Sequence, residues 1–254
     1  MKFEFLFALL AAVPAHAMIG GKAKPFASAV YIQELKCSGV LIVPDVVLTA
    51  GHCLFKSTTR QPSLRAGVAV RVHARSGRRE EVHSAVAKRV DAHPSWRELI
   101  DQYADANRAA EDPRAVDLAF VELDRALPIE SARVAGPAEP APERLVVSGW
   151  GCERVGGITL TKLKVALVDA RPFGASKSKT ETLDHWTDRL AGHCAGDSGG
   201  GAYLESAGGT PTVYSINSYL ELDHSQGGPR GEVPTISVRL NAPDAHEWVQ
   251  ALLR

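Results

Sequence analysis

The stretch Gly196-Asp197-Ser198-Gly199-Gly200 is the sharpest motif in the chain. A serine hydroxyl is a weak nucleophile unless a neighbouring base activates it. Flanking glycines adopt backbone angles that other residues resist. They let the main chain approach a ligand and direct its N–H groups at a developing negative charge. The motif marks Ser198 as a candidate nucleophile, with a glycine-rich turn as the structural alternative.

Two further stretches supply the partners that such a serine needs. His52 lies beside Cys53 after an apolar run, and Asp117 is a lone carboxylate inside an apolar run. A buried carboxylate is costly without a partner, and an imidazole N–H is a suitable one. Each residue also has a structural interpretation, as a core histidine and as a turn-capping aspartate. The presence of all three, in the order His, Asp, Ser, favours nucleophilic chemistry.

The composition fits a globular domain and excludes some functions. The chain has 254 residues, of which 45% are apolar and 23% charged. That is enough to bury a substantial core. Lys plus Arg and Asp plus Glu both number 29, so the formal net charge is zero. The global basic field of a nucleic-acid-binding protein is therefore absent.

Residues 1–17 are typical of a secretory signal peptide. Lys2 is followed by the apolar run FLFALLAAV at 5–13, and the Ala-His-Ala at 15–17 offers a small-x-small cleavage site. A buried N-terminal strand or helix is the alternative. The run is too short to span a bilayer, and no later run reaches about 18 apolar residues. We therefore expect no membrane anchor, and export to the medium or the periplasm.

Short β-rich runs between turn signals recur along the rest of the chain, which is typical of sandwiches and barrels. They occupy residues 29–32, 39–43, 46–48, 68–72, 118–121, 145–147, 163–168, 212–216 and 235–238. Two stretches, 96–110 and 243–253, predict helices. The proline-rich segment 137–142 is the most linker-like part of the chain.

Together these motifs resemble the chymotrypsin/trypsin-type serine endopeptidases. The similarity covers nearly all of the chain after residue 17. It rests on segments 18–21 (MIGG), 37–53 around His52, 92–94 (AHP), 117–119 (DLA), 149–151 (GWG), 194–200, Pro234 and the C-terminal helix. The resemblance implies an all-β fold of two antiparallel six-stranded β-barrels with a C-terminal α-helix. Residues 18–254 would form this peptidase domain, with barrel halves of roughly 18–136 and 137–254.

The resemblance also implies a secreted endopeptidase that cleaves polypeptides through an acyl-enzyme. Ser198 would be the nucleophile, His52 the general base and Asp117 the residue that orients His52. The N–H groups of Gly196 and Ser198 would form the oxyanion hole. We expect a monomer with no metal or organic cofactor. A protein inhibitor could bind this monomer. Segment 66–79, where relatives hold calcium, has no carboxylate.

Family members are activated when a new N-terminal amine pairs with the aspartate before the catalytic serine. The resemblance assigns this pair to Met18 and Asp197. No Lys or Arg lies just before Met18, so we expect signal cleavage after Ala17 to create the amine directly. Met18 stands where Ile or Val is usual, and its flexible side chain could fill the same apolar pocket.

The chain has four cysteines, which allow three pairings in an exported protein. The resemblance matches Cys37 and Cys53 to the bridge that braces the histidine loop. Cys194 matches a cysteine whose usual partner lies downstream, but no cysteine follows it here. Cys152 is the remaining candidate. We expect Cys37–Cys53 and Cys152–Cys194 bridges, with two free thiols as the alternative for the second pair.

The expected specificity pocket differs from that of trypsin. The resemblance places Gly192 at the pocket base, where it has no carboxylate to attract Lys or Arg. Ser215 is matched to the serine of a wall that usually reads Ser-Trp-Gly, and Asn217 and Thr235 stand where open pockets carry glycine. Bulk there favours small or aliphatic side chains before the scissile bond. A protonated His193 would instead favour acidic ones.

Several features depart from the family pattern. Segments 96–115 and 221–233 are longer than their counterparts, and the first either narrows the substrate cleft or is a surface insertion. Gly51 replaces an alanine, and Gly201 replaces a proline. These changes keep open a non-catalytic homologue that acts as a binding protein. An esterase is a further alternative, but Ser198 does not lie in the GxSxG elbow of lipases.

Overall fold

The computed structural model describes residues 26–55, 61–76, 79–112, 114–151, 163–172, 182–187, 196–205, 209–220 and 233–254. Several predicted features lie outside these ranges and stay predictions. They are the signal segment 1–17, Met18, Cys152, Gly192, His193, Cys194 and most of segment 221–233.

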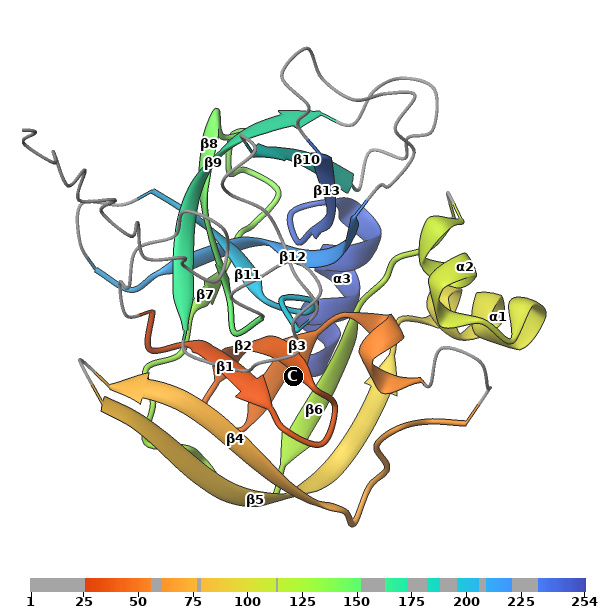
Figure 1. Ribbon diagram of the computed structural model, residues 1–254, viewed down its shortest axis with the longest axis vertical. Helices are drawn as coiled ribbons and strands as arrows, with labels where there is room; N and C mark the ends of the chain where they lie inside the picture. The colour runs from red at the N-terminus through yellow and green to blue at the C-terminus, as the bar shows by residue number, and fades with distance from the viewer. Residues whose placement is uncertain are drawn as a thin grey trace, which may run out of the picture.

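The first half of the chain forms a closed six-stranded barrel, in the lower part of Figure 1. Its strands are β1 (Ala29–Ile32), β2 (Cys37–Val43), β3 (Val46–Thr49), β4 (Ala69–Ser76), β5 (Arg79–Ala92) and β6 (Ala119–Leu123), in the order β1-β2-β3-β6-β5-β4. Strands β1 and β3 are buried along their whole length, and β2 along all but its last residue. Strand β4 alternates buried and exposed positions instead, because one face of a pleated strand meets water.

The second half forms a seven-stranded sheet that also closes on itself. Its strands are β7 (Arg133–Val134), β8 (Arg144–Gly149), β9 (Lys164–Pro172), β10 (Thr182–Thr187), β11 (Gly201–Leu204), β12 (Thr212–Leu220) and β13 (Val233–Arg239). Pairing of β11 with β12 closes the ring β11-β8-β9-β10-β13-β12, and β7 joins β12 in parallel outside it. The predicted all-β fold with two six-stranded barrels is confirmed. The chain passes to the second sheet between β6 and β7, slightly ahead of the expected boundary near 136.

Helices cover the ends and the joint of the barrels. The expected C-terminal helix is present as α3 (Pro243–Leu252). The helix expected over 96–110 is instead two helices, α1 (Pro94–Tyr103) and α2 (Ala106–Glu111). They separate at Ala104, whose φ of 55° is left-handed and ends α1. In the described part of the chain, no helix is long and apolar enough to cross a membrane.

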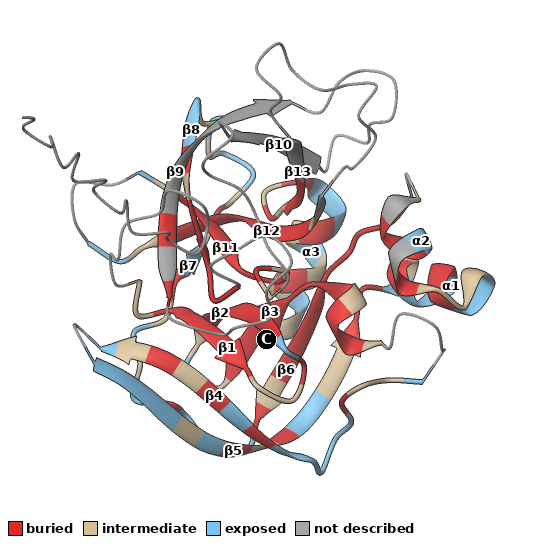
Figure 2. Ribbon diagram, viewed as in Figure 1, coloured by how far each residue is buried: buried red, intermediate tan, exposed pale blue. Residues whose placement is uncertain are grey.

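The two largest buried clusters lie inside the first barrel and at the joint of the two barrels. One fills the first barrel and includes the α1–α2 segment through Trp96, Leu99 and Ala109. The other joins the two barrels and α3, and combines side chains such as Leu48, Ile216 and Val249. Figure 2 shows these buried positions concentrated on the strands where the barrels meet. A catalytic cleft between the barrels would therefore rest on a rigid joint.

Candidate active site

Asp117 is a buried carboxylate with three hydrogen-bond donors. It lies just before β6 and is 1% exposed. Its Oδ1 accepts the main-chain N–H of His52 at 2.8 Å, and its Oδ2 accepts the Nδ1–H of His52 at 2.8 Å. The hydroxyl of Ser218 donates to the same Oδ2. Three donors on one buried carboxylate compensate for the water that it has lost.

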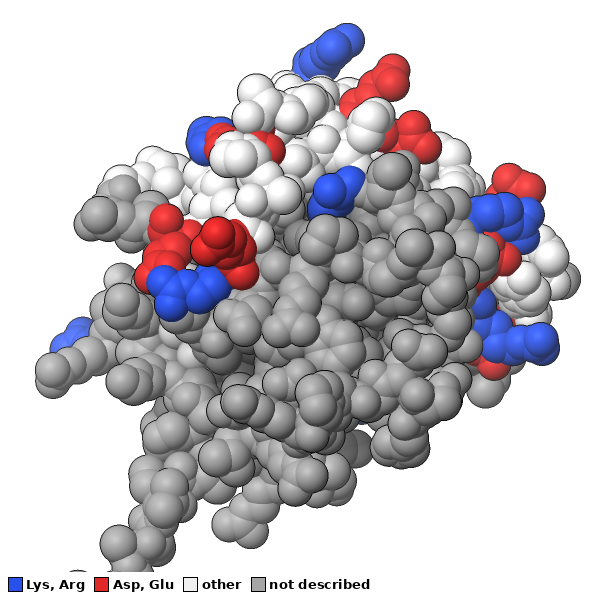
Figure 3. Space-filling view, turned by 90° about the horizontal axis from the view of Figure 1, so that it is seen from above, with Lys and Arg blue, Asp and Glu red and all other residues white. Residues whose placement is uncertain are grey.

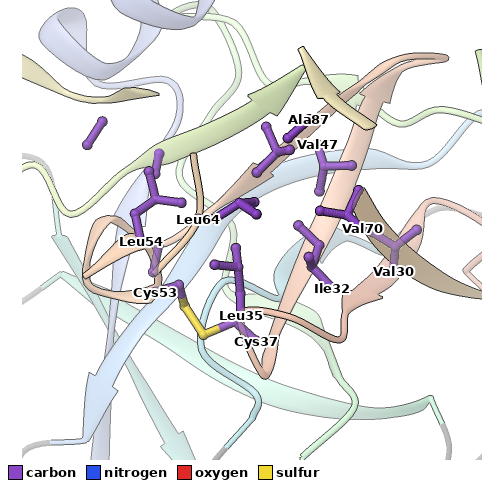
Figure 4. Packing of buried hydrophobic residues seen from close by; sticks show 14 of the residues in the cluster. Val30, Ile32, Leu35, Cys37, Val47, Cys53, Leu54, Leu64, Val70 and Ala87 are labelled. Carbon is purple, nitrogen blue, oxygen red and sulfur yellow. A yellow bond between two sulfur atoms is a disulfide. The ribbon is translucent and has the colours of Figure 1, made fainter. Parts of the chain in front are cut away.

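His52 is held by its own short helix and by a disulfide. It belongs to the 3-10 helix η1 (Gly51–Leu54), which begins two residues after β3 ends. The next residue, Cys53, is bonded to Cys37 at the start of β2, so this predicted bridge is present. Figure 4 shows the disulfide among apolar side chains of the first barrel, including Leu35 and Leu54. The imidazole is therefore anchored at both the main chain and the ring.

The contact between His52 and Asp117 changes both pKa values. Burial alone would lower the pKa of His52, but the charge and hydrogen bond of Asp117 hold it above the ordinary 6.5. Burial alone would raise the pKa of Asp117, but the charge of His52 and the hydrogen bonds from His52 and Ser218 hold it below the ordinary 3.8. Asp117 thus stays ionised near neutral pH. Its carboxylate keeps the Nδ1 of His52 protonated and leaves Nε2 for proton transfer.

The segment that carries Ser198 is docked onto the first barrel. The main-chain N–H of Ser38 donates to the carbonyl of Gly196 at 3.1 Å, and the Ser38 hydroxyl donates to the same oxygen at 2.7 Å. At the other end, Gly199 has a φ of 80° and packs so closely that a Cβ would overlap Thr49 and the carbonyl of Ser38. Only glycine fits both conditions. Ser198 therefore lies between two points fixed on β2 and β3, the strands that lead to His52.

Asp197 points into the protein rather than into solvent. It is fully buried, and its Oδ1 accepts the N–H of Gly151 at 2.7 Å. A Cβ at Gly149 or Gly151 would overlap the carboxylate, so the GWG segment leaves room for it. Met18, its expected partner, lies outside the described residues. Asp197 thus occupies the inward position that the expected pairing requires.

The structure corrects the predicted pocket wall. Ser215 and Asn217 are both fully buried, and the Asn217 amide donates to the carbonyls of Ser148 and Asp197. Neither side chain is available to a substrate. The serine that reaches Asp117 is Ser218, which sequence reasoning missed. One signal was present, because Ser218 is followed by the aromatic Tyr219, as in a Ser-Trp wall, whereas Ser215 is followed by isoleucine.

Thr235 can be placed by its main chain. It is the Cα partner of Leu220 on β12 and of His185 on β10. Leu220, two residues after Ser218 on β12, therefore lies opposite Thr235 of β13. The expected pocket residues Gly192 and His193 are outside the described ranges.

The long segment 96–115 is not a surface appendage. Trp96, Leu99 and Ala109 are nearly or fully buried in the core of the first barrel. Figure 1 shows α1 and α2 on the same side of the molecule as η1. Tyr103 and Arg114 both bind the Asp112 carboxylate, at 2.8 and 2.9 Å, which ties the two ends of the segment together. The segment is thus built into the side of the barrel that carries His52.

One group of side chains could be mistaken for a metal site. The Sγ atoms of Cys37 and Cys53 and a ring nitrogen of His52 lie within 4.8 Å of one another. Both sulfur atoms are bonded in the disulfide, so neither is a thiolate that could bind a cation. Among these three, only the imidazole remains as a ligand, which does not make a structural metal site.

Charged groups on the surface are paired rather than segregated. Figure 3 shows Lys and Arg beside Asp and Glu on the described part of one face. The ion pairs include Arg133–Glu139 at 2.5 Å and Arg144–Glu205 at 3.1 Å. Over the described residues of this face, alternating signs of this kind give no extended field for a polyanion.

Comparisons with known proteins agree with this geometry. A family model described as Trypsin matches residues 17–248. The chain is 28% identical to a chymotrypsin-like elastase family member 3B of Macaca mulatta, over 84% of this chain and 80% of that protein. It is 28% identical to a proproteinase E of Bos taurus, over 81% and 79%, and 27% identical to a human kallikrein-4, over 89% and 82%. The chain therefore belongs to the trypsin family of serine endopeptidases.

Proposed function

We propose that the protein hydrolyses peptide bonds with Ser198 as nucleophile, His52 as general base and Asp117 as the residue that orients His52. The observation that carries the proposal is the pair of hydrogen bonds that hold His52 against Asp117. Asp117 accepts hydrogen bonds from both the ring and the main chain of this residue, at 2.8 Å each. A carboxylate bound to Nδ1 in this way fixes the tautomer of the ring and leaves Nε2 as the nitrogen that can accept a proton.

The proposed reaction has two halves. Ser198 Oγ attacks the scissile carbonyl carbon while its proton passes to His52 Nε2, and the Asp117 charge stabilises the imidazolium. The C–N bond breaks as His52 returns the proton to the leaving amine. Water then attacks the acyl-serine by the same route and regenerates the enzyme. The N–H groups of Gly196 and Ser198 stabilise the oxyanion, and loss of one such donor typically costs about 10²–10³ in kcat.

We propose that small or aliphatic side chains are preferred before the scissile bond. Leu220 and Thr235 are Cα partners on neighbouring strands, where a pocket that admits large side chains would need glycine. The relatives named as elastases are consistent with this preference. An acidic preference set by His193 is the second candidate. A peptide library that varies only the residue before the cleaved bond separates the two.

We also propose that the protein is exported and activated by removal of its first 17 residues. The family match begins at residue 17, and Cys37–Cys53 is a bridge that an oxidising compartment favours. The new amine of Met18 would then pair with the inward-facing Asp197. N-terminal sequencing of active protein should read Met-Ile-Gly-Gly. Any other start would contradict this route.

The test of catalysis uses a fluorophosphonate probe, which reacts only with an activated serine. The exported protein should be labelled on Ser198, and Ser198→Ala should abolish the label. Ser215→Ala is the matched control, because Ser215 is a buried serine of the neighbouring strand β12. Correctly processed, folded protein that takes no label and cleaves no peptide would contradict the proposal and favour the binding homologue.

A further inference from the structure

Gly51, the first residue of η1, lies where a side chain has no room. A Cβ built at Gly51 would lie 2.7 Å from Trp96 Cδ2, 2.8 Å from Trp96 Cγ and 2.9 Å from Asp117 Oδ1. Real carbon atoms do not approach other heavy atoms so closely without displacing them. The indole of Trp96 and the carboxylate of Asp117 therefore border the same small space, and the missing side chain of Gly51 keeps that space open.

Trp96 cannot move away from this space. It lies in the first turn of α1 and is fully buried, with Leu99 and Ile100 of the same helix nearly so. Its Nε1 is buried and has no hydrogen-bond partner among the described residues. A buried N–H without a partner costs free energy, so polar bonding does not hold the indole in place. Among the described residues, packing against Gly51 and the core of the first barrel sets its position.

The position of the indole matters for Asp117 because the carboxylate is held on its other sides by donors. His52 donates to both oxygens, and Ser218 donates to Oδ2. The space at Gly51 adjoins Oδ1, the oxygen that accepts the main-chain N–H of His52. The rigid, apolar indole of Trp96 beside this oxygen keeps water away from the carboxylate and prevents the carboxylate from moving away from His52.

We infer that Trp96 and Gly51 form a matched pair that positions Asp117 against His52. Trp96 is thus a positioning residue that acts through Asp117 and touches no substrate. The inference goes beyond the proposed function, and rests on it only for its kinetic readout. It requires that the two residues depend on each other. A methyl group at Gly51 is harmful because the indole fills the adjoining space, and a smaller residue at 96 makes that methyl tolerable.

The experiment is a double-mutant cycle of wild type, Gly51→Ala, Trp96→Leu and the double variant. Gly51→Ala should push Oδ1 from the His52 N–H. Displacement of about 1 Å should lower kcat about 10²-fold with little change in KM. It should also lower the pKa of His52, because Asp117 supports the charged imidazole less well. The double variant should regain most of the lost kcat and most of the lost His52 pKa. Gly136→Ala is the control, since a Cβ there meets nothing within 4 Å.

A second readout separates this inference from the proposed function. NMR titration of His52 reports its pKa whether or not the protein cleaves peptides. If the protein shows no peptidase activity, the proposed function is contradicted. The matched pair is still supported if the pKa of His52 falls in Gly51→Ala and returns in the double variant. The pair is overturned if folded Gly51→Ala keeps the wild-type pKa of His52, or if the double variant is no closer to wild type than Gly51→Ala. If Gly51→Ala does not fold, a folded double variant supports the pair and an unfolded one overturns it.

Discussion

His52 and Ser198 belong to different barrels and are held in opposite ways. His52 is held by hydrogen bonds to the charged Asp117 and by a disulfide one residue away. The segment of Ser198 is held by main-chain fit, with Gly199 in a left-handed conformation against β2 and β3. The position of His52 therefore depends on charge and on pH, whereas the position of Ser198 depends on the absence of a Cβ at Gly199. The two can be disturbed separately.

Removal of the charge beneath His52 should have the largest effect. If Asp117 orients His52 as proposed, Asp117→Asn should lower kcat about 10⁴-fold, because the amide favours the wrong tautomer of the imidazole. The general base acts when neutral, so wild-type kcat/KM should fall as pH drops through a His52 pKa above 6.5. Without the Asp117 charge, burial lowers that pKa, and the acid limb of the profile should move to lower pH.

The pH dependence of kcat/KM on a small peptide substrate measures this shift. Asp124→Asn is the control, because Asp124 is an exposed carboxylate at the end of β6. An acid limb that stays in place in Asp117→Asn would show that Asp117 does not set the pKa of His52.

A side chain at Gly199 should disturb the nucleophile alone. Gly199→Ala adds a Cβ that overlaps Thr49 and Ser38 and strains a positive φ. We expect fluorophosphonate labelling of Ser198 to slow about 10²–10³-fold because the oxyanion N–H groups move with the loop. The pKa of His52 should not change.

Gly209→Ala is the matched control for this variant. Gly209 also has a positive φ, of 92°, but a Cβ there meets nothing within 4 Å. It carries the backbone strain without the overlap. Equal labelling rates for the two variants would show that the overlap with the first barrel does not position the Ser198 loop.

Loss of the disulfide should lower the free energy of unfolding, because the bridge braces the part of the first barrel that carries His52. Replacement of both Cys37 and Cys53 by alanine opens a loop with a sequence separation of 16. Such a loop is worth about 3 kcal/mol of unfolding free energy in the chain-entropy account. Denaturant unfolding measures the change, with Ser84→Ala as a control, because Ser84 is an exposed serine of β5 and its replacement leaves the bridge intact. An unchanged unfolding free energy would show that packing alone holds η1.

The smallest effect on stability is expected in the α1–α2 segment. Like the site of His52, this segment contains a charged hydrogen-bond acceptor, Asp112, but Asp112 does not bind His52. The Tyr103 hydroxyl donates to Asp112 at 2.8 Å, and Arg114 binds the same carboxylate. Arg114 holds the pKa of Asp112 well below its usual range, so the acceptor stays charged. Tyr103→Phe should cost about 1 kcal/mol of unfolding free energy. Thermal unfolding at neutral pH checks this, and a change in the pKa of His52 would contradict it.

The sequence indicated which residue types to examine, but some placements escaped it. The apolar runs predicted the strands, since alternation and β-branched residues are local properties. The helix over 96–110 was predicted as one because good helix formers continue through it, and the left-handed Ala104 leaves no local signal. Ser218 was missed because the register of β12 against β13 shifts between Asn217 and Tyr219. A bulge of this kind redirects a side chain against strict alternation.

Some features of this protein therefore follow from its sequence, and others follow only from its tertiary structure. The sequence by itself determined the all-β class and the His, Asp and Ser motifs, because these depend on residue type and order, whereas the Cys37–Cys53 pairing was expected from the family resemblance. Only the tertiary structure decided that Ser218 reaches Asp117, that Asn217 is buried beneath the Ser198 loop, and that Trp96 fills the space beside Gly51. Such contacts join residues far apart in the chain. Sheet register and close packing set them, and neither leaves a periodic pattern in the sequence.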